Sequence, residues 1–312
     1  MTTTNGSHGM GHAPVSSGAD ASAPATPAPQ SDAGFFWPNG ARLVISISMQ
    51  FESGAQSEHD NGSPFPAMDK QFPDLPARTW FEYGVREGIP RMLDLWDRHG
   101  VKVTSHMTGQ AVERNPQLAR EIVQRGHEAA AHGQTWTPHW NITAEEERAS
   151  YQANIDALVR ATGTRPVGYN AFWLRSTPRT LGILQQLGFT YHIDDLSADE
   201  PMTTTVNGQP FAIVPYTLRM NDIARFGAEG PLTAAAFGQE LKDEFDQLYA
   251  EAAGRRRMMS ISMHDRIAGT PGRVKRIGEF LAYAKQHPGV AFARKDEIAQ
   301  WALSMPQVPS KA

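Results

Sequence analysis

From residue 42 onward, short apolar runs of strand length alternate with segments whose apolar residues recur at the helical period. The strand-like runs are residues 42–49, 101–106, 129–131, 166–170, 190–193, 258–263 and 290–293. Helices are predicted over residues 80–99, 116–125, 143–161, 178–187, 232–253, 272–286 and 295–303. Repeated strand–helix units are typical of a mainly parallel sheet. The chain carries no glycine-rich phosphate motif, so we expect an α/β fold: a distorted (β/α) barrel of about seven parallel strands.

Two segments depart from this alternation. Asn207 and Gly208 lie between extended runs within residues 203–214, which predicts an inserted β-hairpin with a type I′ turn. Residues 1–34 contain no Leu, Ile, Phe, Tyr or Trp and cannot bury enough surface to offset their ordering entropy. We therefore expect a disordered tail over residues 1–34 and a single catalytic domain over residues 35–312. The tail has no cationic start and no apolar core, so we expect no secretory signal and a cytoplasmic protein.

Charge and composition exclude several classes of function. The net charge of −4 gives no electrostatic reason to expect nucleic acid as a partner. The one compact basic run, residues 255–257, precedes a strand and is interpreted as a solvated turn. No apolar run approaches the roughly 18 residues that cross a bilayer, so no membrane partner is expected. The absence of cysteine excludes disulfides, thiolate nucleophiles and cysteine-based zinc sites.

Polar residues follow the predicted strands, and the C-terminal rim of the strands is where barrels gather their chemistry. Gln50 and Glu52 share one face at the end of the first strand. Glu52 could hold a metal, act as a base, bind a substrate N–H, or be a structural carboxylate. His132 and His264 end two other strands, and each is a candidate proton shuttle or else a buried core histidine. Arg266 could clamp a carboxylate or an imide oxygen.

Further polar and aromatic residues after the strands suggest one pocket for a small molecule. The predicted substrate-binding residues are Gln50, Trp136, Asn170, Trp173, Asp195, Tyr216, Asn221 and Arg266. Taken singly, most of them are more often caps or turn residues. A histidine four residues after His132 would have made a metal pair, but Trp136 stands there. His106 and His139 are weaker candidates for the site.

Several of these segments resemble the polysaccharide deacetylase (NodB-homology, carbohydrate esterase 4) superfamily, and most closely its allantoinase-like branch. The resemblance runs from about residue 36 to residue 301. The matching pieces are residues 50–54 (QFESG), 126–128 (GHE), 132–136 (HGQTW), 215–218 (PYTL), 221–222 (ND), 258–264 (MMSISMH) and 269–273 (GTPGR).

The resemblance implies a distorted β/α barrel, a hydrolase of non-peptide carbon–nitrogen bonds, and assembly as a homo-oligomer. The metal-dependent members use one Asp and two His as ligands, and the matching positions here are Gln50, His132 and Trp136. With two of three ligands replaced, no tightly bound metal is favoured, although weak binding of a divalent ion such as zinc stays open. Whether any metal is bound, and which substrate is used, both stay open.

We therefore expect hydrolysis of a cyclic ureide or imide. Glu52 or His132 would take a proton from water, His264 would protonate the departing nitrogen, and Arg266 or a backbone N–H would steady the oxyanion. One alternative is a metal-dependent carbohydrate N-deacetylase whose ligand set is rebuilt from His106, His139 or Glu52. The other is a catalytically inactive relative that binds a small molecule.

Overall fold

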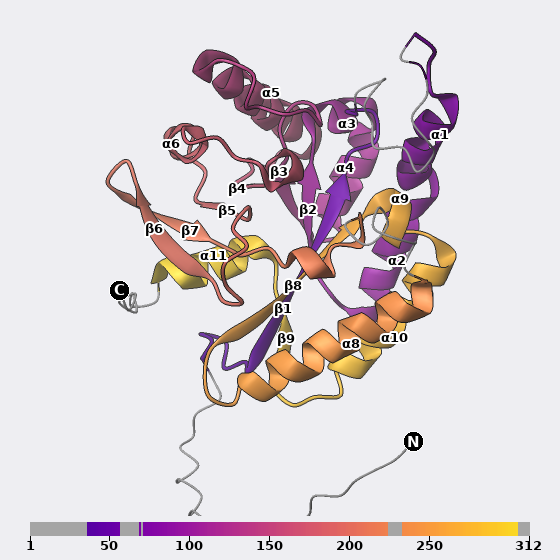
Figure 1. Ribbon diagram of the computed structural model, residues 1–312, viewed down its shortest axis with the longest axis vertical. Helices are drawn as coiled ribbons and strands as arrows, with labels where there is room; N and C mark the ends of the chain where they lie inside the picture. Colours follow the sequence, from indigo (N-terminus) through magenta and orange to yellow (C-terminus); the bar gives the residue numbers. More distant parts are fainter. Residues whose placement is uncertain (1–35, 57–68, 70, 224–232, 305–312) are drawn as a thin grey trace, which may run out of the picture. The chain divides into compact units, whose positions relative to one another are not determined.

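The computed structural model describes residues 36–56, 69, 71–223 and 233–304 (Figure 1). Its strands are β1 (Leu43–Phe51), β2 (Thr104–Met107), β3 (Glu128–Ala131), β4 (Gly168–Tyr169), β5 (Tyr191–His192), β6 (Met202–Val206), β7 (Gln209–Ile213), β8 (Arg257–His264) and β9 (Val290–Phe292). Every predicted strand has its counterpart here. The tail predicted over residues 1–34 lies outside the described residues and stays an expectation.

Helices alternate with these strands along the described chain. The α-helices are α1 (Leu75–Tyr83), α2 (Ile89–His99), α3 (Gly109–Arg114), α4 (Pro116–Gln124), α5 (Ala144–Thr162), α6 (Thr180–Gln186), α8 (Ala234–Glu251), α9 (Asp265–Ala268), α10 (Pro271–Ala284) and α11 (Lys295–Ser304). Short helical turns are η1 (Gly84–Gly88), η2 (Phe172–Leu174) and η3 (Leu218–Met220). The prediction missed the short helices α3 and α9. None of the described helices combines the length and apolar character that crossing a membrane requires.

The strands form one sheet in the order β6-β7-β5-β4-β3-β2-β1-β8, and β9 also pairs with β1. All neighbouring strands are parallel except β6 and β7. The sheet curls into a half-barrel surrounded by helices (Figure 1). The predicted distorted barrel of about seven parallel strands is confirmed, because β1 to β5, β7 and β8 form that series.

The predicted hairpin is also present, as β6 and β7. Its turn residues Asn207 and Gly208 have φ angles of 50° and 76°, and a type I′ turn requires positive φ at both positions. The hairpin is more than an insertion, since β7 pairs in parallel with β5 and so continues the barrel wall.

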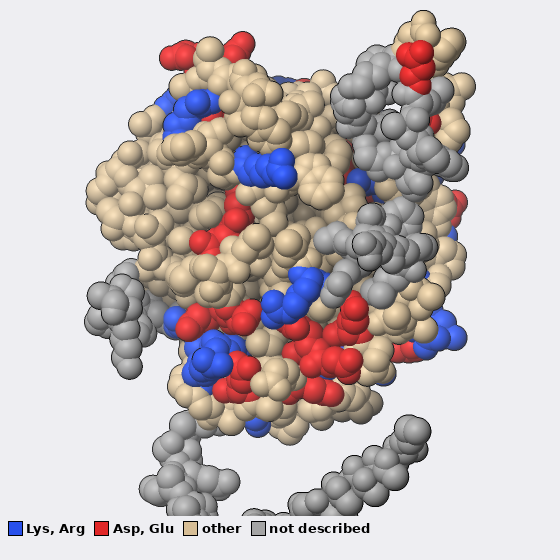
Figure 2. Space-filling model, in the orientation of Figure 1, with Lys and Arg blue, Asp and Glu red and all other residues tan. Residues whose placement is uncertain are grey.

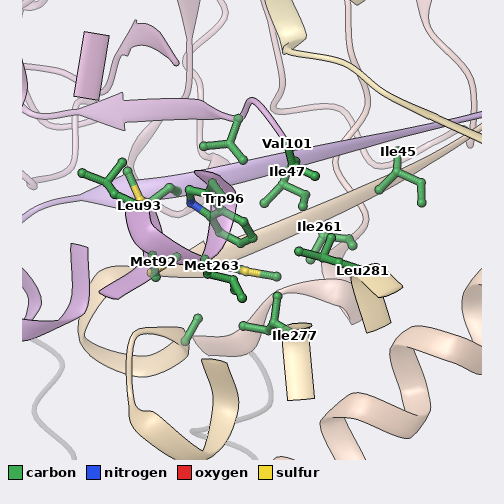
Figure 3. Close-up of a cluster of buried hydrophobic side chains, with 14 of the residues drawn as sticks. Ile45, Ile47, Met92, Leu93, Trp96, Val101, Ile261, Met263, Ile277 and Leu281 are labelled. Carbon is green, nitrogen blue, oxygen red and sulfur yellow. The ribbon is translucent and has the colours of Figure 1, made fainter. Parts of the chain in front are cut away.

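The two faces of the central strands differ in character. On β1, Ile45 and Ile47 pack outward against α2, α8 and α10 in the main hydrophobic core (Figure 3). Full burial of one such side chain contributes about 1.5–3 kcal/mol. The alternate residues of β1 face the barrel interior and are polar from Ser46 onward; the Ser46 hydroxyl accepts a hydrogen bond from Lys295 Nζ at 3.2 Å. A strand that is buried on both faces therefore still delivers polar groups to the rim.

The helix predicted over residues 80–99 begins earlier and is interrupted. Asp74 caps the N-terminus of α1 by accepting a hydrogen bond from Ala77 N. Between α1 and α2 the chain forms the π-helical turn η1, where a Cβ atom on Gly84 would clash with Asp265 Cγ. The close approach of α9 thus accounts for the glycine, and π-helical turns often mark functional sites.

Charged residues on the surface pair locally. Arg255 and Arg257 form ion pairs with Glu251, and Arg256 pairs with Glu200. The basic run is therefore paired, and Arg257 is buried at the start of β8 and not in a solvated turn as predicted. On the face drawn in Figure 2, acidic and basic side chains are interspersed.

Candidate active site

The C-terminal ends of the strands surround a small cavity of about 60 Å³ that opens to solvent. The cavity is lined by Gln50, Glu52, His132, Trp136, Asn170, Ala171, Trp173, Leu174, Tyr216, Leu218, Asn221, Ile223 and His264. It therefore brings together the three predicted catalytic residues and six of the eight predicted substrate-binding residues. The remaining two, Asp195 and Arg266, do not line it.

Glu52 is the centre of the polar cluster. It directly follows β1 and is fully buried, and its Oε1 lies 3.3 Å from His132 Nε2 and 3.6 Å from His264 Nε2. Its Oε2 accepts a hydrogen bond of 2.8 Å from Arg266. Burial raises the pKa of Glu52, but the charges of Arg266, His264 and His132 outweigh burial and hold the pKa well below its usual range. Glu52 is therefore an ionised carboxylate and a weak base.

His132 is held by a neutral partner. Its Nδ1 lies 2.7 Å from the backbone oxygen of Asn170, which can only accept, so Nδ1 carries a hydrogen. Nε2 is left to face the cavity and Glu52. This geometry fixes the ring and its tautomer without placing a charge on the Nδ1 side.

His264 is held by a charged partner, Asp222. Its Nδ1 lies 2.7 Å from Asp222 Oδ1, and Asp222 Oδ2 accepts hydrogen bonds from the backbone N–H groups of His264 and Ala268 at 2.9 and 3.1 Å. The sequence prediction missed Asp222 as a site residue. The only signal was the short Asn221–Asp222 match, in which the acidic residue follows an irregular segment.

Arg266 does not sit where a substrate clamp would. It is 1% exposed, and its guanidinium carbon lies 3.9 Å from the ring centre of Phe81 and 4.8 Å from that of Trp80. It contacts Glu52 and, at 3.5 Å, Asp265 Oδ1. The expected oxyanion contact is corrected: Arg266 lies behind Glu52 because β8 passes directly into α9, which turns the side chain away from the cavity.

Asp195 also lies outside the cavity. Its carboxylate accepts hydrogen bonds from the backbone and hydroxyl of Ser197, so it serves a local turn. The neighbouring Asp194 is the residue tied to the site, because its Oδ1 accepts a hydrogen bond of 2.9 Å from Asn170 Nδ2. The prediction therefore selected the wrong member of this acidic pair.

Aromatic rings form one wall of the cavity. The Trp136 ring is 4.7 Å from Phe172 and 6.0 Å from Trp173, measured between ring centres. Trp173 and Leu174 have φ angles of 51° and 60°, and bulky residues adopt such conformations at a cost in strain. Trp173 is nevertheless 48% exposed, so the strained turn presents an indole at the mouth of the cavity.

The residues present do not fit a tightly held divalent metal. Gln50 and Trp136 stand where a carboxylate and an imidazole would be needed, and the Arg266 guanidinium beside Glu52 would repel a second cation. His139 cannot replace a ligand, since its ring nitrogens face Tyr151 and Ser150 at 3.3 and 3.4 Å. Within the described ranges, no three His, Cys, Asp or Glu side chains are grouped to hold a metal.

Comparisons with known proteins agree with this fold. The polysaccharide deacetylase family model matches residues 73–192. A solved structure described as a "probable Polysaccharide deacetylase" from Pseudomonas aeruginosa PAO1 is 32% identical, with a TM-score of 0.79 over 87% of this chain and 95% of that one. The structure of PuuE allantoinase is 31% identical, with a TM-score of 0.79 over 87% and 94%. The peptidoglycan deacetylase of Helicobacter pylori is 24% identical over 68% of this chain and 82% of its own length.

The fold and these matches define a hydrolase with a NodB-type (β/α) barrel that acts on carbon–nitrogen bonds other than peptide bonds. The chain belongs to the polysaccharide deacetylase family. Its similarity to PuuE allantoinase places an allantoinase-like structure among its relatives, as the sequence resemblance predicted.

Proposed function

We propose that this protein opens a cyclic imide or ureide by hydrolysis, with His132 as the general base and His264 as the general acid. The observation that carries this proposal is the convergence of two imidazole Nε2 atoms on one carboxylate oxygen, Glu52 Oε1. The two rings differ in what they meet at Nδ1, and that difference separates their roles.

The charge beside each ring decides which is the acid. Asp222 Oδ1, 2.7 Å away, accepts the Nδ1 hydrogen of His264, so we assign to this ring the form with hydrogens on both nitrogens, which can give the Nε2 hydrogen to the substrate. His132 donates from Nδ1 to the neutral carbonyl oxygen of Asn170, so we assign the base role to this ring, whose Nε2 must lose the hydrogen that it can donate to Glu52 Oε1 at 3.3 Å before it takes one from water. Pairs of titratable groups in contrasting environments commonly divide acid and base work in this way.

Hydrolysis begins at a ring carbonyl and ends with the ring opened. Water attacks one ring carbonyl carbon, a C–O bond forms, and His132 Nε2 takes one proton from the water. The ring C–N bond breaks while His264 Nε2 gives its proton to the nitrogen, which leaves a carboxylic acid and an amide in the opened product. Exchange with solvent returns His132 to the neutral form and His264 to the protonated form.

Other cavity residues support binding of a flat ring. Trp136 and Trp173 would stack against its face, since both line the cavity with their rings 6.0 Å apart. Asn221 Oδ1 accepts a hydrogen bond from Ile223 N, so its amide nitrogen is the group that can donate to the carbonyl oxygen under attack. This assignment replaces the oxyanion role that the sequence suggested for Arg266.

A panel of substrates tests the proposal. Succinimide, hydantoin and allantoin should be ring-opened, and His132→Gln and His264→Gln should each lower kcat by about 10²–10⁴-fold. His99→Gln, on α2 and outside the cavity, is the matched control and should leave kcat unchanged.

Two outcomes would overturn it. Release of acetate from N-acetyl sugars without any ring opening would favour the carbohydrate N-deacetylase. Tight binding of a cyclic ligand with no turnover, at an affinity that both histidine variants retain, would favour a binding protein.

We also propose that the protein acts in the cytoplasm as a homo-oligomer. Light scattering of the purified protein tests its oligomeric state.

A further inference from the structure

A chain of hydrogen bonds runs from a buried carboxylate to the wall of the cavity. Asp194, which follows β5, accepts hydrogen bonds from Asn170 Nδ2 and Ala171 N at 2.9 Å each and from Ser176 Oγ at 2.8 Å. Asn170 Oδ1, in turn, accepts a hydrogen bond of 3.3 Å from Gln50 Nε2. Three side chains from three different strand ends are thus connected in series.

The donors and acceptors of this series allow only one orientation of each amide. The side chain of Asp194 is 2% exposed, and although burial raises its pKa, His192 and the other hydrogen bonds lower it, so the carboxylate only accepts. Asn170 must therefore turn Nδ2 toward Asp194, where Nδ2 also donates to Ala171 O at 3.2 Å. Its Oδ1 is left for Gln50, which must present Nε2 to it.

The consequence is an acceptor at the far end of the series. Gln50 Oε1 is buried and meets no hydrogen-bond donor in the part of the chain that the structure describes, although Gln50 lines the cavity. A buried carbonyl oxygen without a donor is uncommon, and in a binding site it marks a place for a ligand donor or an ordered water. Asp194 fixes Asn170 Oδ1 toward Gln50. The Gln50 amide therefore cannot rotate by 180° to present Nε2, in place of Oε1, at its unpaired end.

We propose that Gln50 Oε1 accepts a hydrogen bond from a substrate N–H, and that Asp194 and Asn170 are positioning residues that fix this polarity. The inference rests on the proposed function and narrows it to imides and ureides that carry an unsubstituted ring nitrogen. An N-methyl analogue would leave the carbonyl oxygen buried without a donor and would add a methyl group against it.

The preference for an N–H substrate over its N-methyl analogue can be estimated from the free-energy penalty for leaving the buried Gln50 Oε1 without a donor. That penalty corresponds to roughly 10- to 100-fold in kcat/KM between a substrate with the N–H and its N-methyl analogue. A site built around a substrate N–H commonly discriminates by at least this much.

The experiment compares succinimide with N-methylsuccinimide and hydantoin with its N-methyl analogues, each rate divided by the buffer hydrolysis rate of the same compound. Wild-type protein should prefer the N–H form by about 10- to 100-fold. Gln50→Leu should bring this preference close to one, mainly by slowing the N–H substrate. Asp194→Asn should weaken the preference, because an asparagine can donate and so release the orientation of Asn170. Asp195→Asn, the adjacent carboxylate outside the cavity, should leave it unchanged.

A preference that Gln50→Leu retains, or a wild-type protein that opens both forms equally, would overturn the inference. Calorimetric binding of the same compounds separates this result from failure of the proposed function. If no ring is opened but the N–H forms still bind more tightly in a Gln50-dependent way, the hydrolysis proposal fails and the N–H site stands. If rings are opened with no such dependence, the N–H site fails and the hydrolysis proposal stands.

Discussion

Replacing Asp222 by asparagine should remove the acid from the site while keeping its shape. Asp222 Oδ2 accepts two backbone N–H groups, from His264 and Ala268, and an asparagine oxygen must stay there to satisfy them. The asparagine Nδ2 would then take the place of Oδ1, at 2.7 Å from His264 Nδ1. Since Nδ2 donates, Nδ1 would have to accept, and His264 could no longer hold protons on both nitrogens.

The expected loss in kcat is about 10²–10⁴-fold, the usual contribution of general acid catalysis. Stability should change little, because the two backbone hydrogen bonds survive. Asp222→Ala makes the contrast: it leaves two buried N–H groups unsatisfied and should cost about 2–6 kcal/mol in free energy of unfolding. Steady-state hydrolysis of hydantoin, together with urea unfolding followed by circular dichroism, measures both quantities.

The acid role of His264 would be refuted if Asp222→Asn kept kcat within about threefold of the wild type, since loss of the general acid should lower kcat by more than that. It would also be refuted if Asp222→Asn lowered kcat only in proportion to lost folded protein. Asp195→Asn serves as the matched control, because its carboxylate contacts only Ser197 among the described side chains.

Buried charged and apolar side chains also control the stability of the fold. Arg266→Met should leave the Glu52 charge without its partner and cost about 3–5 kcal/mol in urea unfolding, whereas the exposed Arg98→Met should cost little; an equal, small effect of both would contradict the ion-pair account. Burial and Glu52 raise the pKa of Asp265 from 3.8 to about 6 against the lowering charge of Arg266. The folded state therefore retains this proton longer than the unfolded state, and stability is lost as the pH rises through about 6. As the pH rises from 4 to 6, the free energy of unfolding of Asp265→Asn should therefore increase by up to about 3 kcal/mol relative to that of the wild type. A difference in free energy that does not change with pH would exclude the raised pKa of Asp265. Leu93→Ala in the core should cost about 2–5 kcal/mol, and a thermal melt unaffected by it would contradict the packing described.

The periodicity of the strands was enough to predict the positions of most cavity residues at the strand ends. Gln50, His132 and His264 end or follow strands whose length and apolar character are visible in the sequence, and parallel strands bring their C-terminal ends to one rim. Alternation along β1 also placed Gln50 and Glu52 on the same side. These features depend on local sequence, which is why they could be predicted.

The residues whose position the sequence did not predict lie where the backbone has left a strand. Arg266 follows His264 by two residues and would share its face on a continuing strand, but the chain enters α9 at Asp265 and the period changes. Asp194 and Asp195 stand in a loop after β5, where alternation no longer decides which one faces Asn170. Asp222 comes from an irregular segment that meets β8 through the isolated Asn221–Ser262 bridge, a tertiary contact that no local pattern encodes.

The central claim, that the side chains of this protein carry out the hydrolysis without a bound metal, is tested most directly by activity after metal removal. Chelator-treated protein whose metal content is shown by elemental analysis to be far below one ion per chain should open hydantoin or succinimide as fast as untreated protein, and added zinc should not increase the rate. Loss of activity on chelation that returns when a divalent ion is added would contradict the account.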